Sequence, residues 1–174
     1  SLRTNTTGDN NVAVGYGALY SQTTADNNTA CGRDALNDNT TGTNNVAVGA
    51  YALDANTTGQ NNTSVGYNSL GKNTTAVNST AVGTDALRDS TTAGSNTAVG
   101  EASLRACTTG GENTAVGVNA GLELTTGANN LLLGVNAGRS VSPAGQITTS
   151  SNSVCLGNNS TTGIFCADTT ISSS

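Results

Sequence analysis

The sequence predicts an all-β fold, a repetitive β-solenoid or β-roll in which each coil takes 17 residues. The first observation is a six-residue unit, NNVAVG or a close variant, that ends in glycine and returns at a constant interval. Its closing glycines lie at positions 15, 32, 49, 66, 83, 100, 117 and 134. Equal intervals in succession indicate stacked repeats, because low-complexity linkers do not keep such a phase.

The second observation is a composition that does not suit an ordinary globular core. Hydrophobic residues make up 34% of the 174 residues and aromatic residues 3%. Coils with so few bulky apolar side chains become stable only by stacking on one another or on partner chains. The net charge is −5 and basic residues do not cluster, so we expect no nucleic-acid partner. No apolar run reaches about 18 residues, so we expect no membrane insertion.

The third observation is the alternation within the repeated unit, which predicts one short strand per coil, as at Asn45-Val46-Ala47-Val48. The residue before each glycine is Val, Cys or Leu, and we expect this column, with Cys31 in it, to form the core stripe. The column two residues earlier accepts Thr and is expected to be partly buried. The column between these two holds mainly Ala or Ser, which predicts a tight contact where no large side chain fits. Stacking also predicts an amide ladder through Asn11, Asn28, Asn45 and Asn62.

The rest of each coil predicts two turns. An Ala-Leu pair such as Ala52-Leu53 follows the glycine and predicts one helical or 3₁₀ turn that places leucine on the core. Asp34, Asn68 and Asp85 directly precede such pairs, as helix N-caps do, and capping is favoured over calcium binding. The coil then closes with Thr-Thr-Gly or Thr-Thr-Ala, as at 40–42, where glycine predicts a turn with positive φ.

The array divides the chain into three segments. Residues 1–139 form the regular repeat array, 140–151 an insertion loop with the only proline, and 152–174 a terminal coil and strand. Residues 164–167 predict that last strand. Gly121 and Gly138 stand where leucine stands in earlier coils, which predicts a narrower core there. The first residues are already in phase with the repeat, so we expect a longer array upstream.

Repeats of the NNTAVGYxAL…TTG type resemble those of bacteriophage tail fibres and related virion spikes. The NxVAVG strand also resembles the unit of YadA-like trimeric autotransporter heads, and the resemblance covers residues 4–157. It implies a homotrimer, intertwined or side by side, and other virion or tail proteins upstream. The ending, at 163–165 and 170–174, resembles the junction before an endosialidase-type intramolecular chaperone. That chaperone trimerises the fibre and cuts itself off at a Ser-Asp bond, so a chain ending at Ser174 is similar to the matured product.

These observations lead to one functional hypothesis and two alternatives. The first is the structural and adhesive shaft of a phage tail fibre, assembled in the host cytoplasm and carried on the virion as an extracellular fibre. It presents or contributes to a contact with a host-cell surface glycan or protein. The first alternative is the head of a bacterial trimeric autotransporter adhesin, at the bacterial cell surface. The second is a monomeric solenoid that binds ice or another crystalline surface through ranks of Thr such as Thr57-Thr58.

Enzymatic chemistry is not expected. The sequence contains no His, and its eleven carboxylates stand at differing phases of the repeat rather than as a repeated pair. Four cysteines are too few and too irregular for a disulfide framework and are expected as free thiols. The spacing of Cys155 and Cys166 fits no common zinc pattern. We therefore predict no cofactor and no metal site.

Ligand contacts are expected at the positions that vary between coils, since variation on a constant scaffold often faces a partner. A merely solvated outer surface is the alternative for each of them. The tyrosines among them suit stacking on sugar rings. The candidate receptor-facing residues follow the glycine or the leucine of their coils: Tyr16, Tyr20, Tyr67, Arg33, Lys72, Arg88 and Arg105.

Overall fold

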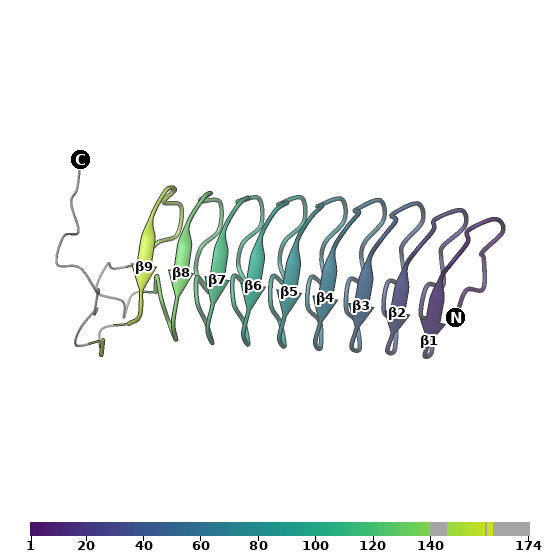
Figure 1. The fold of residues 1–174 in the computed structure, drawn as a ribbon, viewed down its shortest axis with the longest axis horizontal. Helices are drawn as coiled ribbons and strands as arrows, with labels where there is room; N and C mark the ends of the chain where they lie inside the picture. The colour runs from purple at the N-terminus through teal and green to yellow at the C-terminus, as the bar shows by residue number, and fades with distance from the viewer. Residues whose placement is uncertain (140–145, 159, 162–174) are drawn as a thin grey trace.

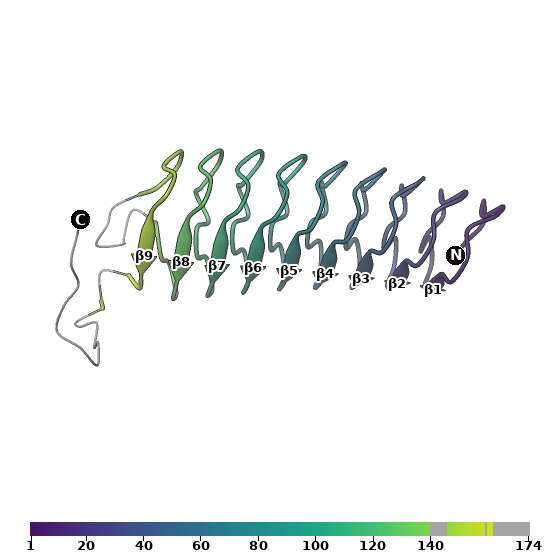
Figure 2. The same cartoon turned by 45° about the horizontal axis from the view of Figure 1, so that its top comes forward.

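The computed structural model describes residues 1–139, 146–158 and 160–161, which form an elongated parallel β-solenoid (Figure 1). Nine strands, one per coil, pair in sequence order as a single parallel sheet, so the predicted fold class is confirmed. In a view turned about the long axis, each coil repeats the course of its neighbour (Figure 2). The strands are β1 (Val12–Val14), β2 (Thr29–Cys31), β3 (Val46–Val48), β4 (Thr63–Val65), β5 (Thr80–Val82), β6 (Thr97–Val99), β7 (Thr114–Val116), β8 (Leu131–Leu133) and β9 (Val154–Leu156).

The core lies inside the coil of a single chain. It consists of the middle residues of the strands, such as Ala47, and the leucines of the first six turns, such as Leu53, both fully buried. The expected core stripe is therefore wrong: Val48 is 38% exposed, and Cys31 in the same column is exposed too. Strand and leucine lie so close that only a small side chain fits between them, so the neighbouring residues of the strand point outward.

The predicted amide ladder through Asn11, Asn28, Asn45 and Asn62 is confirmed, and after an interruption at Ser79 it continues from Asn96 to Asn130. The Oδ1 atom of Asn45 accepts a hydrogen bond from the backbone N–H of Asn62 at 3.0 Å, and its Nδ2 atom donates to the carbonyl of Gly59 at 2.9 Å. A second, unpredicted ladder lies beside the first: Asn56 Nδ2 donates to Asn39 Oδ1 at 2.9 Å and, at 3.1 Å, to the same carbonyl of Gly59. These buried amides satisfy backbone groups that no strand pairs, which joins each coil to the next.

The turns differ from the expected helical form, because no helix occurs in the described part of the chain. Leucine does reach the core, but it does so in the left-handed region, with φ of 52° at Leu53. Asp34, Asn68 and Asp85 have positive φ as well, so they are not helix N-caps. The first Asn of each NN pair is also left-handed, with φ of 59° at Asn44. Asn and Asp tolerate this conformation better than most residues.

The two recurrent glycines have different roles. Gly49 has φ of 134° and lies directly over Gly66 of the next coil, so both its conformation and its contact exclude a side chain. Gly42, in the Thr-Thr-Gly turn, does not have the positive φ that was expected. A Cβ atom there would overlap the carbonyl oxygen of Gly59, so this position accepts only small residues because of close stacking.

The core does not narrow at the C-terminal end, contrary to expectation. Gly121 replaces leucine, and a Cβ atom there would lie 2.6 Å from Cδ1 of Leu132, which replaces the strand alanine in β8. Leu124 and Ile147 add further buried volume. After the insertion the array resumes, with Leu132 of β8 paired to Cys155 of β9. Residues 140–145 of the insertion, the strand predicted at 164–167 and the chaperone junction lie outside the described residues.

Candidate functional site

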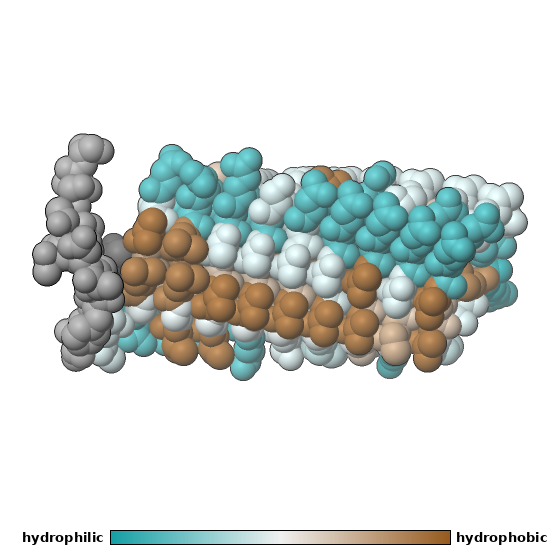
Figure 3. All heavy atoms as spheres, in the orientation of Figure 1, coloured by the Kyte–Doolittle hydropathy of each residue, from teal (hydrophilic) through white to brown (hydrophobic). Residues whose placement is uncertain are grey.

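The outward residues of the strands form a continuous uncharged surface with an apolar row along its length, here called the sheet face (Figure 3). It contains the first and third residue of every strand, and none of these positions is charged. The exposed fraction is 57% at Val14, 38% at Val48 and 37% at Leu133. The apolar band is wider at the C-terminal end, because Leu131 and Val154 replace Thr in β8 and β9, and because Val118 and Val135, just after the glycines that follow β7 and β8, are also exposed. The residues of the sheet face are Val12, Val14, Thr29, Cys31, Val46, Val48, Thr63, Val65, Thr80, Val82, Thr97, Val99, Thr114, Val116, Leu131, Leu133, Val154 and Leu156.

An open face of this kind is unusual for a parallel sheet, which is normally covered on both sides. A long apolar surface on a water-soluble protein commonly marks a contact with another molecule. Sequence reasoning missed the sheet face because it assigned the bulky column to the core. The signal that could have found it is the Ala or Ser column, since the side of a strand that accepts only small residues is the more crowded side.

Three of the candidate residues share the column after the glycine, beside the sheet face. Tyr16 is 80% and Tyr67 53% exposed. Between them the guanidinium of Arg33 lies 5.4 Å from the ring centroid of Tyr51, whose ring meets that of Tyr67 edge-on at 5.8 Å. Arg33 also donates a hydrogen bond to Asp34 at 3.1 Å, which raises the pKa of Arg33. Tyr51 was not predicted, because its column otherwise holds mainly small or polar turn residues.

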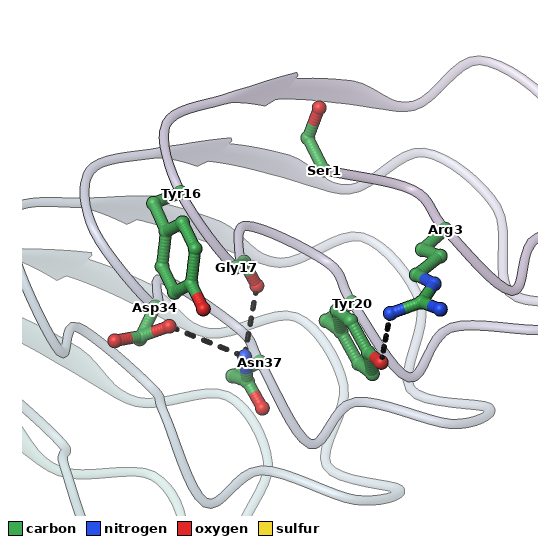
Figure 4. A pocket seen from close by; sticks show the side chains of 7 residues that line it. All are labelled: Ser1, Arg3, Tyr16, Gly17, Tyr20, Asp34 and Asn37. Atoms are coloured by element: carbon green, nitrogen blue, oxygen red, sulfur yellow. Dashed lines mark hydrogen bonds between the residues drawn. The ribbon is translucent and has the colours of Figure 1, made fainter.

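Tyr20 lies at a depression of about 490 Å³ in the first two coils, together with Tyr16 (Figure 4). The guanidinium of Arg3 stacks 5.5 Å from the ring centroid of Tyr20 and donates a hydrogen bond to its hydroxyl at 2.9 Å. Asp34 and Asn37 line the opposite side and are 3.4 Å apart, from amide nitrogen to carboxylate oxygen. The structure therefore brings Tyr16 and Tyr20 to one depression, while Tyr67 belongs to the pair with Tyr51.

The remaining basic candidates lie on the turn after the leucine. Lys72 Nζ and Arg88 Nη2 both approach the carboxylate of Asp89, each at 2.8 Å. Partial burial disfavours the charged carboxylate, but hydrogen bonds from these two cations outweigh it and lower the pKa of Asp89. Arg105 is half-buried and forms no ion pair with a described residue. Lys72 and Arg88 are therefore engaged within the chain rather than free for an acidic ligand.

The paired threonines divide into two columns with different environments. From Thr40 to Thr125 the first threonine of each pair is half-buried and donates its hydroxyl to the next coil, as Thr57 does to the carbonyl of Thr74 at 3.0 Å. The second is exposed in every coil, and its hydroxyl has no partner among the described residues. This second column, here called the threonine rank, is one residue wide: Thr7, Thr24, Thr41, Thr58, Thr75, Thr92, Thr109, Thr126 and Thr149.

Two other titratable groups have shifted pKa values. Partial burial, with smaller contributions from Asp38 and Asp34, raises the pKa of Asp54 to about 6. Burial raises the pKa of Cys107 to about 11, and its thiol lies 3.2 Å from the carbonyl of Gly110, so it is a packed core group and not a nucleophile. Within the described ranges, no group of three His, Cys, Asp or Glu residues is placed to hold a metal ion.

Comparison with protein-family models, with curated proteins and with solved structures finds no match. The part of the chain that the structure describes also contains no helix long and apolar enough to cross a membrane.

Proposed function

We propose that the chain is a structural and adhesive fibre shaft, a homotrimer in a virion tail fibre that presents a contact to a host-cell glycan or protein. The observation that carries this proposal is the regular stacking of nine coils, which one parallel sheet joins without interruption and the asparagine ladders join over part of its length. In such an array length scales with the number of repeats, at roughly 4.8 Å per coil, so it holds two points at a fixed separation.

The column that contains Tyr16 and Tyr67 is the favoured receptor contact. Their exposed rings provide flat apolar faces with a polar edge, which suits the faces of sugar rings. Labelled shafts that carry Tyr16→Ser and Tyr67→Ser are expected to lose binding to cells that retain the parent protein, while a shaft with Thr58→Ser binds normally. Undiminished binding by the tyrosine variant contradicts a receptor contact at this column.

A bacterial autotransporter head is compatible with the same solenoid. This alternative differs from the fibre shaft in the segments encoded on either side of the repeats and not in the coil, because an autotransporter gene encodes a signal peptide and a C-terminal membrane anchor. Sequencing the complete gene separates the two: virion structural genes beside it support the fibre shaft, and an encoded anchor supports the adhesin.

The threonine rank favours a second candidate function, the binding of ice or another crystalline surface by a single chain. Its side chains are exposed in every coil and repeat at the spacing of the sheet. The rank is only one residue wide, and the sheet face has no role in this function, so we place it second. Inhibition of ice recrystallisation that is lost on Thr58→Val and Thr75→Val, but kept on Tyr16→Ser, favours this function over the fibre shaft.

A further inference from the structure

We infer that the sheet face is the contact between copies of this chain, which lie parallel and in register around an axis along the solenoid. In this arrangement Cys31 of one copy faces Cys31 of the next. The inference rests on the proposed fibre shaft for the existence of an assembly. It adds which surface meets, in which direction and at which offset.

The composition of the sheet face favours its burial against another molecule. Its outward positions on β1–β9 are uncharged and apolar or Thr, so no ion pair is broken when they leave water. Nine strands at roughly 4.8 Å spacing extend about 40 Å, and a contact along that length, with its flanking columns, reaches several hundred Å² per chain. The opposite side of the same strands is already buried within the chain, as Ala81 and Ala98 show.

The axial repeat of the sheet face, one coil, indicates which kind of partner fits it. Outward side chains recur once per coil, so a complementary surface needs the same axial repeat over many coils. An α-helix, with a pitch of about 5.4 Å, loses register with this repeat within a few coils. A second copy of the chain has the same repeat by construction. Rotation about a common axis parallel to the solenoid then brings every coil against its equivalent, in a closed cyclic assembly.

The difference between the two ends of the sheet face favours parallel over antiparallel copies. At the C-terminal end Val118 and Val135 widen the apolar band, whereas the equivalent column near the N-terminal end holds Arg33. Parallel copies place the wide end against the wide end. An antiparallel copy would lay the surroundings of Arg33, with its partner Asp34, against Val135 and remove an ion pair from water.

Cys31 provides the test, because it is exposed on β2 whereas Cys107 and Cys155 are buried. The protein with Cys166→Ser is treated with a short bismaleimide and its mass is measured by light scattering. We expect a multimer in which Cys31 links to Cys31, and complete loss of the link on C31S. In the C31S background, V116C on the sheet face of β7 restores a link, whereas T41C on the threonine rank does not.

The outcomes separate the inference from the proposed function. A multimer in which Cys31 reacts freely with a monofunctional maleimide and gives no link overturns the inference and leaves the fibre shaft in place. Links between Cys31 and L133C in mixed assemblies, without links between two Cys31 residues, show antiparallel copies and also overturn it. A single chain at all concentrations overturns both. A mass near two chains with Cys31 linked keeps the inference and contradicts the trimer.

Discussion

The two sides of each strand differ in burial and in side-chain size, although their residues alternate along the chain. On β5, Ala81 points into the coil and is fully buried, whereas Val82, one residue later, points out to the sheet face. The larger side chain lies on the more open side. The inner side packs within one chain at close distance, and the outer side carries the bulk that a second surface can cover.

This difference shows that folding of the coil and association of copies use separate residues. The inner side depends on Ala, Leu and Asn positions that recur almost unchanged, as at Ala47, Leu53 and Asn45. The outer side varies among Val, Thr, Cys and Leu without disturbing the sheet register. Changes on the inner side are therefore expected to alter the stability of the chain, and changes on the outer side its assembly.

The largest expected effect is that of a charge on the inner side. Ala81→Asp buries a carboxylate with no cation nearby, at a cost of about 3–5 kcal/mol, which prevents the middle coils from forming. Val82→Asp, one residue away, leaves its carboxylate in water within a single chain. Circular dichroism and thermal unfolding are expected to show loss of structure for the first variant only. Equal loss in both would contradict the separation of the two sides.

A cavity and its repair test the inner side at the C-terminal end. Leu132→Ala removes the side chain that fills the space beside Gly121 and is expected to cost about 2–5 kcal/mol. Gly121→Leu alone clashes with Leu132. The double variant recreates the Ala and Leu pair of earlier coils, so it should be more stable than either single variant. Additive losses in the thermodynamic cycle would show that the two positions do not share one space.

The two asparagines of one NN pair offer a smaller contrast. Asn45→Asp replaces a buried amide donor with an oxygen that faces the carbonyl of Gly59, which costs about 1–3 kcal/mol. Asn44→Asp is its matched control, because Asn44 is exposed and aspartate also accepts positive φ. Urea unfolding should separate the two variants clearly. A similar loss at both positions would mean that the ladder contributes little.

The smallest effect is a dependence of stability on pH. The pKa of Asp54 is about 6 in the folded chain and near 4 when unfolded, because burial and then Asp38 and Asp34 oppose its charge. The folded state holds this proton more tightly, so its contribution is complete below pH 4 and is lost as the pH rises through 6. Because solvent screens the half-exposed carboxylate, this contribution to the free energy of unfolding is about a few tenths of a kcal/mol. Asp54→Asn should remove this dependence of the unfolding free energy on pH. If the dependence is unchanged in the variant, another titratable group causes it.

The repeat period was enough to predict the solenoid, the strand in each coil and the amide ladder, because all three follow from stacking identical units. It could not give the orientation of the strand, since alternation defines two sides without saying which is inside. The large size of Val48 favours the core in sequence, but the small size of Ala47 is what indicates the crowded inner side. The Ala-Leu pair predicts a helical turn because leucine rarely adopts the left-handed region, whereas core packing holds Leu53 there with φ of 52°.

The repeat period also predicts which candidate residues share a column, although their role as receptor contacts stays a prediction. Tyr16, Tyr67 and Arg33 do lie together on an exposed column, because repeats place equivalent positions in line. The involvement of Tyr51 and the pairing of Lys72 with Asp89 depend on contacts between neighbouring coils. Those contacts need the conformation of the turn, which the period alone does not define.

The most direct test of the account is the solution mass of Val82→Asp beside that of the parent protein, by light scattering over a dilution series. We expect a mass near three chains for the parent protein and one chain for the variant, with the same circular dichroism spectrum. A variant that keeps the mass of the parent assembly would show that copies meet elsewhere than on the sheet face, and would contradict the account.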